Sequence, residues 1–383
     1  MLLSSRTTLD DDSERRIGEL VLGEFDWATL VATAHRHQVM PLVAATLLAR
    51  HRADMPTPIE THLSDYSRAL TAQNMHMTAV LLNVLNALDQ ASVPALPYKG
   101  PSLAVTAYGN LRLRAFGDLD ILVPRHRYLE AVSVLEDLGY RPLRPARGNR
   151  RHYLGHASAH AFEKDGTHID LQWGTTYRKA LSVPVETSLW ETGDRVNILG
   201  RDVKAIPPDL LFLFVCAHGA RHHWDRLKWV CDVAEMIRSH PDFDWLEILS
   251  RAKDAGSVRV VYMAITLADR LLGVEVPSWV HDSAKNDEKA MALADLAVEH
   301  NLFAGGEAEY DRSEHLRFTL ATKERRLDRI RYMRGFLFHP ALEDYDWVTL
   351  PDILWFLYPV IRPLRLLIRA IKRRTGVQSA HDH

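Results

Sequence analysis

A chain of 383 residues is longer than one average domain, so we expect two or three compact units. Its 47 Lys and Arg residues nearly balance its 49 Asp and Glu residues, which excludes a strongly basic protein with a general affinity for polyanions. A nucleic-acid partner is therefore not indicated by the net charge, and any such surface would have to be local.

Several features favour a soluble cytoplasmic protein. The two cysteines, Cys216 and Cys231, lie within apolar helical patterns, as expected of small buried side chains in a reducing compartment. The N-terminal residues show no basic segment followed by an apolar run, so we expect no signal peptide. The longest uncharged apolar run near the other end, 353–361, is too short to span a bilayer.

The chain begins with helical periodicity, which continues to about residue 91. Pro41 and the pair Pro56 and Pro58 divide this segment into three or four predicted helices. After Ser92 the pattern changes to short apolar strands that alternate with helices. The predicted strands are 93–98, 119–123, 159–163 and 168–173, and the predicted helices are 102–108 and 127–138.

Helical patterns return from Pro207 onward, while 285–324 is charged and poorly patterned. Asp165-Gly166 separates the last two predicted strands and favours a hairpin. We therefore predict an α+β fold in which a small mixed sheet with helices lies between two helical regions. The predicted units are an N-terminal helical region (1–91), an α/β unit that we call the palm (92–206) and a C-terminal helical region (207–383).

Two carboxylates lie at the start of a buried strand. Residues two apart in a strand point to the same side, so Asp118 and Asp120 present their carboxylates together. Because two like charges beside apolar residues are costly to desolvate, this pattern predicts a bound cation. Mg²⁺, or Mn²⁺ in its place, fits carboxylate oxygens and leaves positions open for phosphate.

A third carboxylate, Asp170, lies on a later apolar strand. If the two strands are neighbours, the three carboxylates can hold two ions that clamp an in-line phosphoryl displacement. Gly100 permits close approach of the backbone, and the amides from Ser102 onward open a helix N-terminus that can receive phosphate. Lys99 and Arg114 are predicted to neutralise charge on a triphosphate.

The segments Lys99-Gly100 and Arg114 to Val123, with the later Ile169-Asp170-Leu171, resemble the bacterial "uncharacterised nucleotidyltransferase" family of the polymerase-β-like superfamily. The resemblance continues through His37-Gln38-Val39 and His218 to Asp232, and to Leu357-Tyr358 and Arg362-Pro363 near the end. It implies a nucleotidyltransferase palm with Asp118, Asp120 and Asp170 as catalytic and metal-binding residues. It also implies that Gly100 and Ser102 form the phosphate loop, although Pro101 splits the superfamily's Gly-Ser pair. Together with Lys99, Arg114 and Gly117, these residues are the predicted nucleotide-binding residues.

We therefore expect a metal-dependent enzyme that moves a nucleoside monophosphate from an NTP, with ATP as the default, to an acceptor and releases pyrophosphate. The acceptor is expected to be a small molecule, natural product or peptide. Two alternatives stay open at this point: phosphoryl or glycosyl transfer at the same metal site, and a nucleotide-binding module without turnover.

A polar run after the first C-terminal helix is the predicted acceptor side of the cleft. Its candidates are His218, His222, His223, Trp224, Lys228 and Asp232. Asp232 is read either as an ion-pair partner of Lys228, one helical turn away, or as a general base.

Two further patterns have plainer explanations. His152, His156 and His160 recur every fourth residue, but the surrounding pattern is loop and strand, which disfavours a zinc site. Near the C-terminus, Arg362, Arg365, Arg369 and Lys372 share one face of an amphipathic helix. Such a helix can bind anionic lipid or a partner, but we expect its apolar face to dock on the protein itself.

Overall fold

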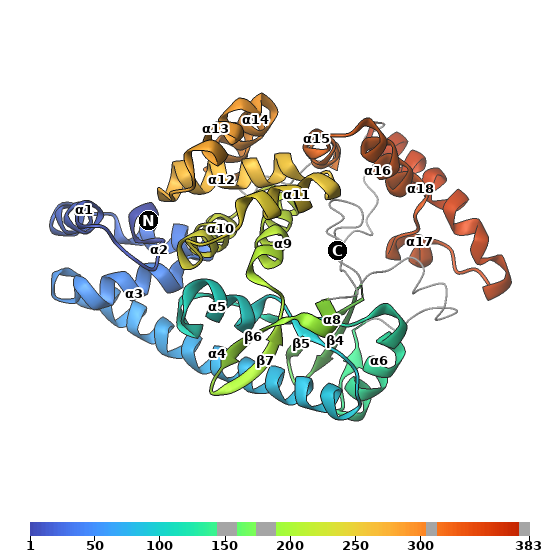
Figure 1. The fold of residues 1–383 in the computed structure, drawn as a ribbon, viewed down its shortest axis with the longest axis horizontal. Coiled ribbons are helices and arrows are strands. Elements are labelled where there is room, and N and C mark those ends of the chain that lie inside the picture. Colours follow the sequence, from blue (N-terminus) through green and yellow to red (C-terminus); the bar gives the residue numbers. More distant parts are fainter. Residues whose placement is uncertain (144–158, 174–188, 304–311, 375–383) are drawn as a thin grey trace.

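The computed structural model describes residues 1–143, 159–173, 189–303 and 312–374 (Figure 1). The chain begins with the short η1 (Leu2–Ser4) and then forms α1 (Asp11–Leu22), α2 (Trp27–Arg36), α3 (Met40–Arg50), η2 (Arg52–Asp54) and α4 (Thr57–Gln90). Side-chain caps from Asp10 and Asp26 start α1 and α2, and prolines lie in the first turns of α3 and α4. The predicted helical start of the chain is confirmed.

The palm contains a five-stranded mixed sheet. Its strands are β1 (Leu96–Pro97), β2 (Asp118–Leu122), β3 (Arg141–Pro142), β4 (Ala159–Lys164) and β5 (Thr167–Gln172), in the order β1-β2-β5-β4-β3. β2 and β5 are parallel, and the other neighbouring pairs are antiparallel. Between them lie α5 (Gly100–Tyr108), η3 (Leu111–Leu113), η4 (Arg125–Arg127) and α6 (Tyr128–Asp137). The predicted hairpin is present, with positive φ at Asp165 and Gly166.

The two faces of this sheet have different neighbours. Leu119 and Ile121 of β2 and Ile169 and Leu171 of β5 are fully buried in a core shared with α4 and α6. Side chains alternate along a strand, so the residues between these, including Asp120, lie on the opposite face. The long helix α4 extends beneath the sheet along the length of the palm (Figure 1).

A second, two-stranded sheet follows α8 (Leu189–Thr192). Its strands, β6 (Asp194–Ile198) and β7 (Arg201–Ala205), form a hairpin that the sequence patterns do not predict. The chain then forms helices α9 (Pro208–Arg221), α10 (Leu227–Ser239), α11 (Trp245–Ala255) and α12 (Val258–Leu272), in the region from Pro207 onward that is predicted to be helical. Next are α13 (Ser278–Asn286), α14 (Glu288–Leu296) and the π-helical η6 (Ala297–Leu302).

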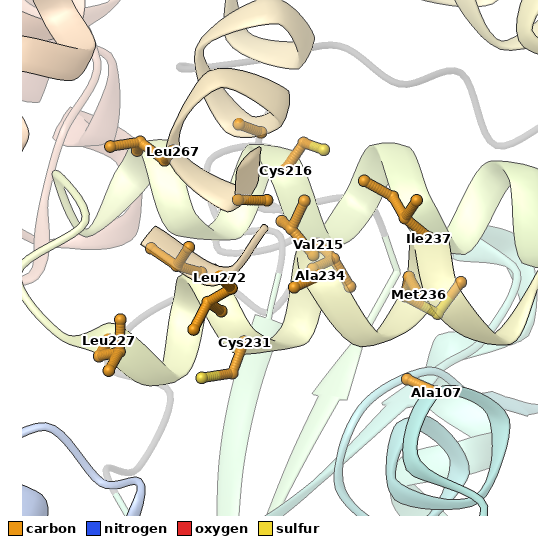
Figure 2. Packing of buried hydrophobic residues seen from close by; sticks show 14 of the residues in the cluster. Ala107, Val215, Cys216, Leu227, Cys231, Ala234, Met236, Ile237, Leu267 and Leu272 are labelled. Atoms are coloured by element: carbon orange, nitrogen blue, oxygen red, sulfur yellow. The ribbon is translucent and has the colours of Figure 1, made fainter. Parts of the chain in front are cut away.

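The largest core joins segments that are far apart in sequence. It combines α2 and α3 with α9, α10 and α12, and it includes Leu103 and Ala107 of α5. Figure 2 shows Val215 and Cys216 of α9 packed near Ala234 of α10. Cys216 and Cys231 are buried and unpaired by disulfide, as expected. The N-terminal and C-terminal helices thus share one core. The division of the chain into three units stays a prediction.

The C-terminal segment forms α15 (Arg312–Thr322), α16 (Arg326–Phe338), α17 (Leu342–Trp347), η7 (Asp352–Leu357) and α18 (Tyr358–Arg374). Arg362 and Arg365 of α18 bind the buried carboxylate of Asp344, at 2.9 and 2.6 Å. Leu364 and Leu367 are more than half exposed. The expectation that the apolar face of this helix docks is therefore wrong, because the buried Asp344 instead draws in the arginine side.

None of the helices in the described part of the chain is long and apolar enough to cross a membrane.

Candidate active site

The three predicted carboxylates lie on one face of two adjacent strands. In the parallel pairing of β2 and β5, Asp120 is opposite Asp170, and Asp118 is opposite His168. Asp118 lies two residues before Asp120 and therefore points to the same side. Asp118 is exposed, Asp170 is half-buried and Asp120 is buried, so the group extends from the protein surface into the palm. The predicted pairing of these strands is confirmed.

Asp120 is held by a cation and an amide. Lys99 Nζ lies 2.8 Å from Asp120 Oδ1, and Gln172 Nε2 donates to the same oxygen at 2.9 Å. Tyr98 in turn donates its hydroxyl proton to Gln172 Oε1 at 2.8 Å, which fixes the orientation of the amide. Tyr98 and Gln172 were not predicted as site residues. Gln172 lies two positions after Asp170 on the same strand face, and this spacing is the signal that identifies it.

Burial and neighbouring negative charges raise the pKa values of two of the three carboxyl groups. Burial and the neighbouring carboxylates of Asp120 and Asp118 raise the pKa of Asp170 to about 6, against the opposing effects of Lys99 and Arg221. Burial also raises the pKa of Asp120, although Lys99 opposes that shift. In the described part of the chain, no group of three or more His, Cys, Asp or Glu side chains is arranged to hold a metal ion. The role of the three carboxylates as metal ligands therefore stays a prediction.

The predicted phosphate loop leads into α5 beside the start of β2. Gly100 has φ +53°, and a Cβ atom there would lie 3.4 Å from the Asp118 carbonyl oxygen, so this turn favours glycine. Ser102 is buried, and its backbone N–H bonds to the Lys99 carbonyl oxygen at 3.2 Å. Gly117 lies in open space just before Asp118. Gly100 and Gly117 thus flank the carboxylates, whereas the hydroxyl of Ser102 is turned away from solvent.

Arg114 and Asp232 form a buried ion pair that joins the palm to α10. Arg114 Nε and Nη2 donate to the two Asp232 oxygens at 2.7 and 2.9 Å, and the Tyr108 hydroxyl donates to Oδ1 at 2.7 Å. Burial would lower the pKa of Arg114, but the charge and hydrogen bonds of Asp232 outweigh this effect and raise it. We therefore propose that Arg114 is a structural residue and not a phosphate ligand. Asp232 is an ion-pair partner, but of Arg114 and not of Lys228.

The end of α9 and the start of α10 carry polar side chains on the side of the palm. We call the surface formed by His218, His222, Lys228 and Trp229 the helical wall. His218 and His222 contact the Trp229 ring, with centroids 4.6 and 5.0 Å away. Burial, together with nearby cations that include Lys99, lowers the pKa of His218 well below its usual value and that of His222 to about 4. Both imidazoles are therefore neutral at pH 7.

Lys228 of the helical wall is placed by the corner between α2 and α3. Its Nζ donates to Gln38 Oε1 at 3.3 Å, and its backbone N–H donates to the His37 carbonyl oxygen at 3.2 Å. Burial and the positive charge of Arg114 lower the pKa of Lys228 to about 7, although Asp232 and Asp118 oppose that shift. His37 and Gln38, which belong to one of the segments that resemble the family, thus hold the start of α10 in place.

Two of the predicted acceptor-side residues lie in the core. Trp224 is 0% exposed, and its ring packs beneath Gly219 of α9. His223 is 2% exposed and packs on Phe318. Both residues have positive φ and form the tight turn after α9, which directs their rings inward. Because both rings are buried, they present almost no surface to an acceptor, and their acceptor-side role stays a prediction.

One histidine of the series seen in the sequence lies among the described residues. His160 lies on β4, where its Nδ1 is 2.9 Å from the Tyr128 hydroxyl oxygen. His152 and His156 lie outside the described residues.

Comparison with known proteins identifies the family. A model of the family described as "Uncharacterised nucleotidyltransferase" matches residues 23–273, more than half of the chain. The chain belongs to this family. The palm, the helical wall and the helices α2 to α4 of this nucleotidyltransferase lie within the match, whereas α1 and the C-terminal residues Leu357 to Pro363 lie outside it.

Two solved structures are similar to this nucleotidyltransferase at low identity. One is the antibiotic-resistance factor ANT(2'')-Ia, with 14% identity and a TM-score of 0.33, covering 50% of this chain and 96% of the other. The second is an antigenic nucleotidyltransferase-like protein from Paracoccidioides brasiliensis, with 14% identity and a TM-score of 0.33, covering 54% and 96%. A comparison with curated proteins gave no match. The family match, and not these likenesses, carries the assignment.

Proposed function

We propose that this nucleotidyltransferase moves a nucleoside monophosphate from an NTP to an acceptor hydroxyl, phosphate or amine in a reaction that requires Mg²⁺ or Mn²⁺. The observation that carries the proposal is that Asp118, Asp120 and Asp170 lie on one face of the paired strands β2 and β5. Three carboxylates gathered on the inner strands of a small sheet are costly in free energy unless the reaction uses them.

The ligand chemistry of the three carboxylates suits a divalent cation. The pKa of Asp170 is raised to about 6 by burial and by the negative charges of its two neighbours, so the group carries an excess of negative charge that a cation would relieve. Asp118, Asp120 and Asp170 offer hard oxygen ligands, which Mg²⁺ prefers. When bound, such ions would stabilise the attacking and leaving oxygens of an in-line displacement at phosphorus.

The residues of the palm have distinct tasks in this proposal. Gly100 and the N-terminus of α5 receive the triphosphate beside Asp118, and Lys99 neutralises its charge. Asp170 accepts the proton of the acceptor, a contribution of roughly a hundredfold or more to the rate. A bond forms between the acceptor atom and the α-phosphorus while the bond to pyrophosphate breaks, and pyrophosphate leaves with the displaced electron pair.

The acceptor is proposed to bind against the helical wall. The ring of Trp229 stacks with the neutral ring of His222 and meets that of His218 edge-on, and the Lys228 amine, with its pKa lowered to about 7, lies beside this aromatic cluster. This combination favours a small molecule, natural product or peptide with a planar or anionic group. ATP is the default donor.

Calorimetric titration of the four common NTPs, with and without Mg²⁺, tests the proposal. We expect affinity that depends on the metal in the wild type and falls at least tenfold in Asp118→Asn/Asp120→Asn. Equal, metal-independent affinity in the two proteins would refute the assignment of these carboxylates. Once an acceptor is found, the label of an α-³²P NTP should appear in the product, whereas phosphoryl transfer would carry over a γ label.

A further inference from the structure

The Lys99 ammonium lies against a carboxylate oxygen of Asp120, the most buried acid of the proposed metal site. Its Nζ lies 2.8 Å from Asp120 Oδ1, and the two side chains are 15% and 2% exposed. Gln172 donates to the same oxygen at 2.9 Å. One carboxylate oxygen of the most buried acid is therefore already satisfied by the protein's own groups.

This contact places the protein's own cation in competition with a divalent ion. Lys99 opposes the upward shift in pKa that burial and Asp118 impose on Asp120, so it already provides part of the charge compensation that a metal would give. An ammonium and a divalent cation cannot occupy the same small space without strong repulsion.

We propose that Lys99 closes the metal site of the nucleotide-free protein and opens it when a triphosphate draws its ammonium away from Asp120. The proposal rests on the proposed function and adds an order to it, because the metal joins Asp120 with the nucleotide and not before it. Lys99 then has two roles: its ammonium neutralises Asp120 in the nucleotide-free protein, and it binds the phosphates once the triphosphate is present.

The position of Lys99 in the chain makes this exchange feasible. Lys99 is the N-cap residue of α5 and immediately precedes Gly100, the glycine that lies against the Asp118 carbonyl. A triphosphate at this helix N-terminus would lie within reach of the Lys99 side chain while its backbone stays fixed. The phosphate oxygens carry more negative charge than Asp120 alone, so they favour transfer of the ammonium.

Binding of Mn²⁺ alone, followed by electron paramagnetic resonance of the free ion, tests the proposal without any turnover. Lys99→Met should bind Mn²⁺ at least tenfold more tightly than the wild type in the absence of nucleotide. Lys99→Arg keeps the cation and should match the wild type, and Lys253→Met removes an exposed lysine of α11 as the control. If Lys99→Met fails to fold, as judged by its melting curve, Lys99→Gln replaces it.

A double variant shows whether the gain in Mn²⁺ affinity occurs at Asp120. Lys99→Met/Asp120→Asn should lose the gain, since the oxygen released by Lys99 no longer carries a charge. Wild-type affinity in Lys99→Met, or a gain that survives Asp120→Asn, would overturn the proposal. NTP titrations separate this result from the proposed function. If no NTP binds while Lys99→Met gains Mn²⁺ affinity, Lys99 closes the metal site but the nucleotidyl transfer proposal fails.

Discussion

Removal of Arg114 should destabilise the whole protein. Arg114 and Asp232 are 4% and 2% exposed, and two short hydrogen bonds join them. In Arg114→Ala the carboxylate of Asp232 stays buried and keeps its hydrogen bond from Tyr108. Removal of one partner of a buried ion pair costs about 3–5 kcal/mol, which is a large fraction of the stability of a typical domain.

Urea unfolding followed by tryptophan fluorescence measures this loss. Arg112→Ala is the matched control, because Arg112 is exposed and lies two residues away, so its removal should change stability by at most about 0.5 kcal/mol. The double variant Arg114→Met/Asp232→Leu should recover much of the stability, since it leaves no buried charge. A loss below about 1 kcal/mol in Arg114→Ala would refute the proposed structural role.

Three further predictions concern stability and catalysis. Because burial lowers the pKa of His223 to about 3, the unfolded chain takes up its proton first as pH falls below about 6.5. Unfolding measurements should therefore show that His223 contributes a loss of roughly 2 kcal/mol between pH 7 and 5, and His223→Gln should remove this part. Gly219→Ala places a Cβ atom inside van der Waals contact distance of the Trp224 ring and should cost about 1–3 kcal/mol in urea unfolding. Gly335→Ala in α16 meets no atom within 4 Å and should instead stabilise by about 0.5–1 kcal/mol, so equal effects at the two glycines would contradict the packing described here. Asp170→Asn should retain NTP binding in calorimetry and lose at least a hundredfold in transfer, and full activity would exclude it as the base.

Local patterns in the sequence were enough to predict the acidic face of the palm. Alternation along the strands places Ile169 and Leu171 in the core and Asp170 on the other face, and the structure agrees. The hairpin of β4 and β5 follows from Asp165-Gly166. Strand alternation and the residue preferences of tight turns depend on a few neighbouring residues, so both can be recognised in a single sequence.

Other features depend on contacts that no local pattern contains. Arg114 pairs with a residue 118 positions away, so its burial and partner follow only from how α10 packs beside the palm. Trp224 follows a helix in a polar run, yet its left-handed backbone conformation turns the ring under Gly219. The hairpin of β6 and β7 turns at Leu199-Gly200, which lacks the Asn-Gly or Asp-Gly signal of a tight turn.

A crystal soaked with Mn²⁺ and a non-hydrolysable NTP tests the central claim most directly. We expect two ions about 3.5–4 Å apart. Asp118 and Asp120 should lie at about 2.0–2.2 Å from them, with Asp170 bound to one ion or to its water. The Lys99 ammonium should have moved from Asp120 to the phosphates. A triphosphate bound elsewhere, or carboxylates beyond coordination range of both ions and their waters, would contradict the account.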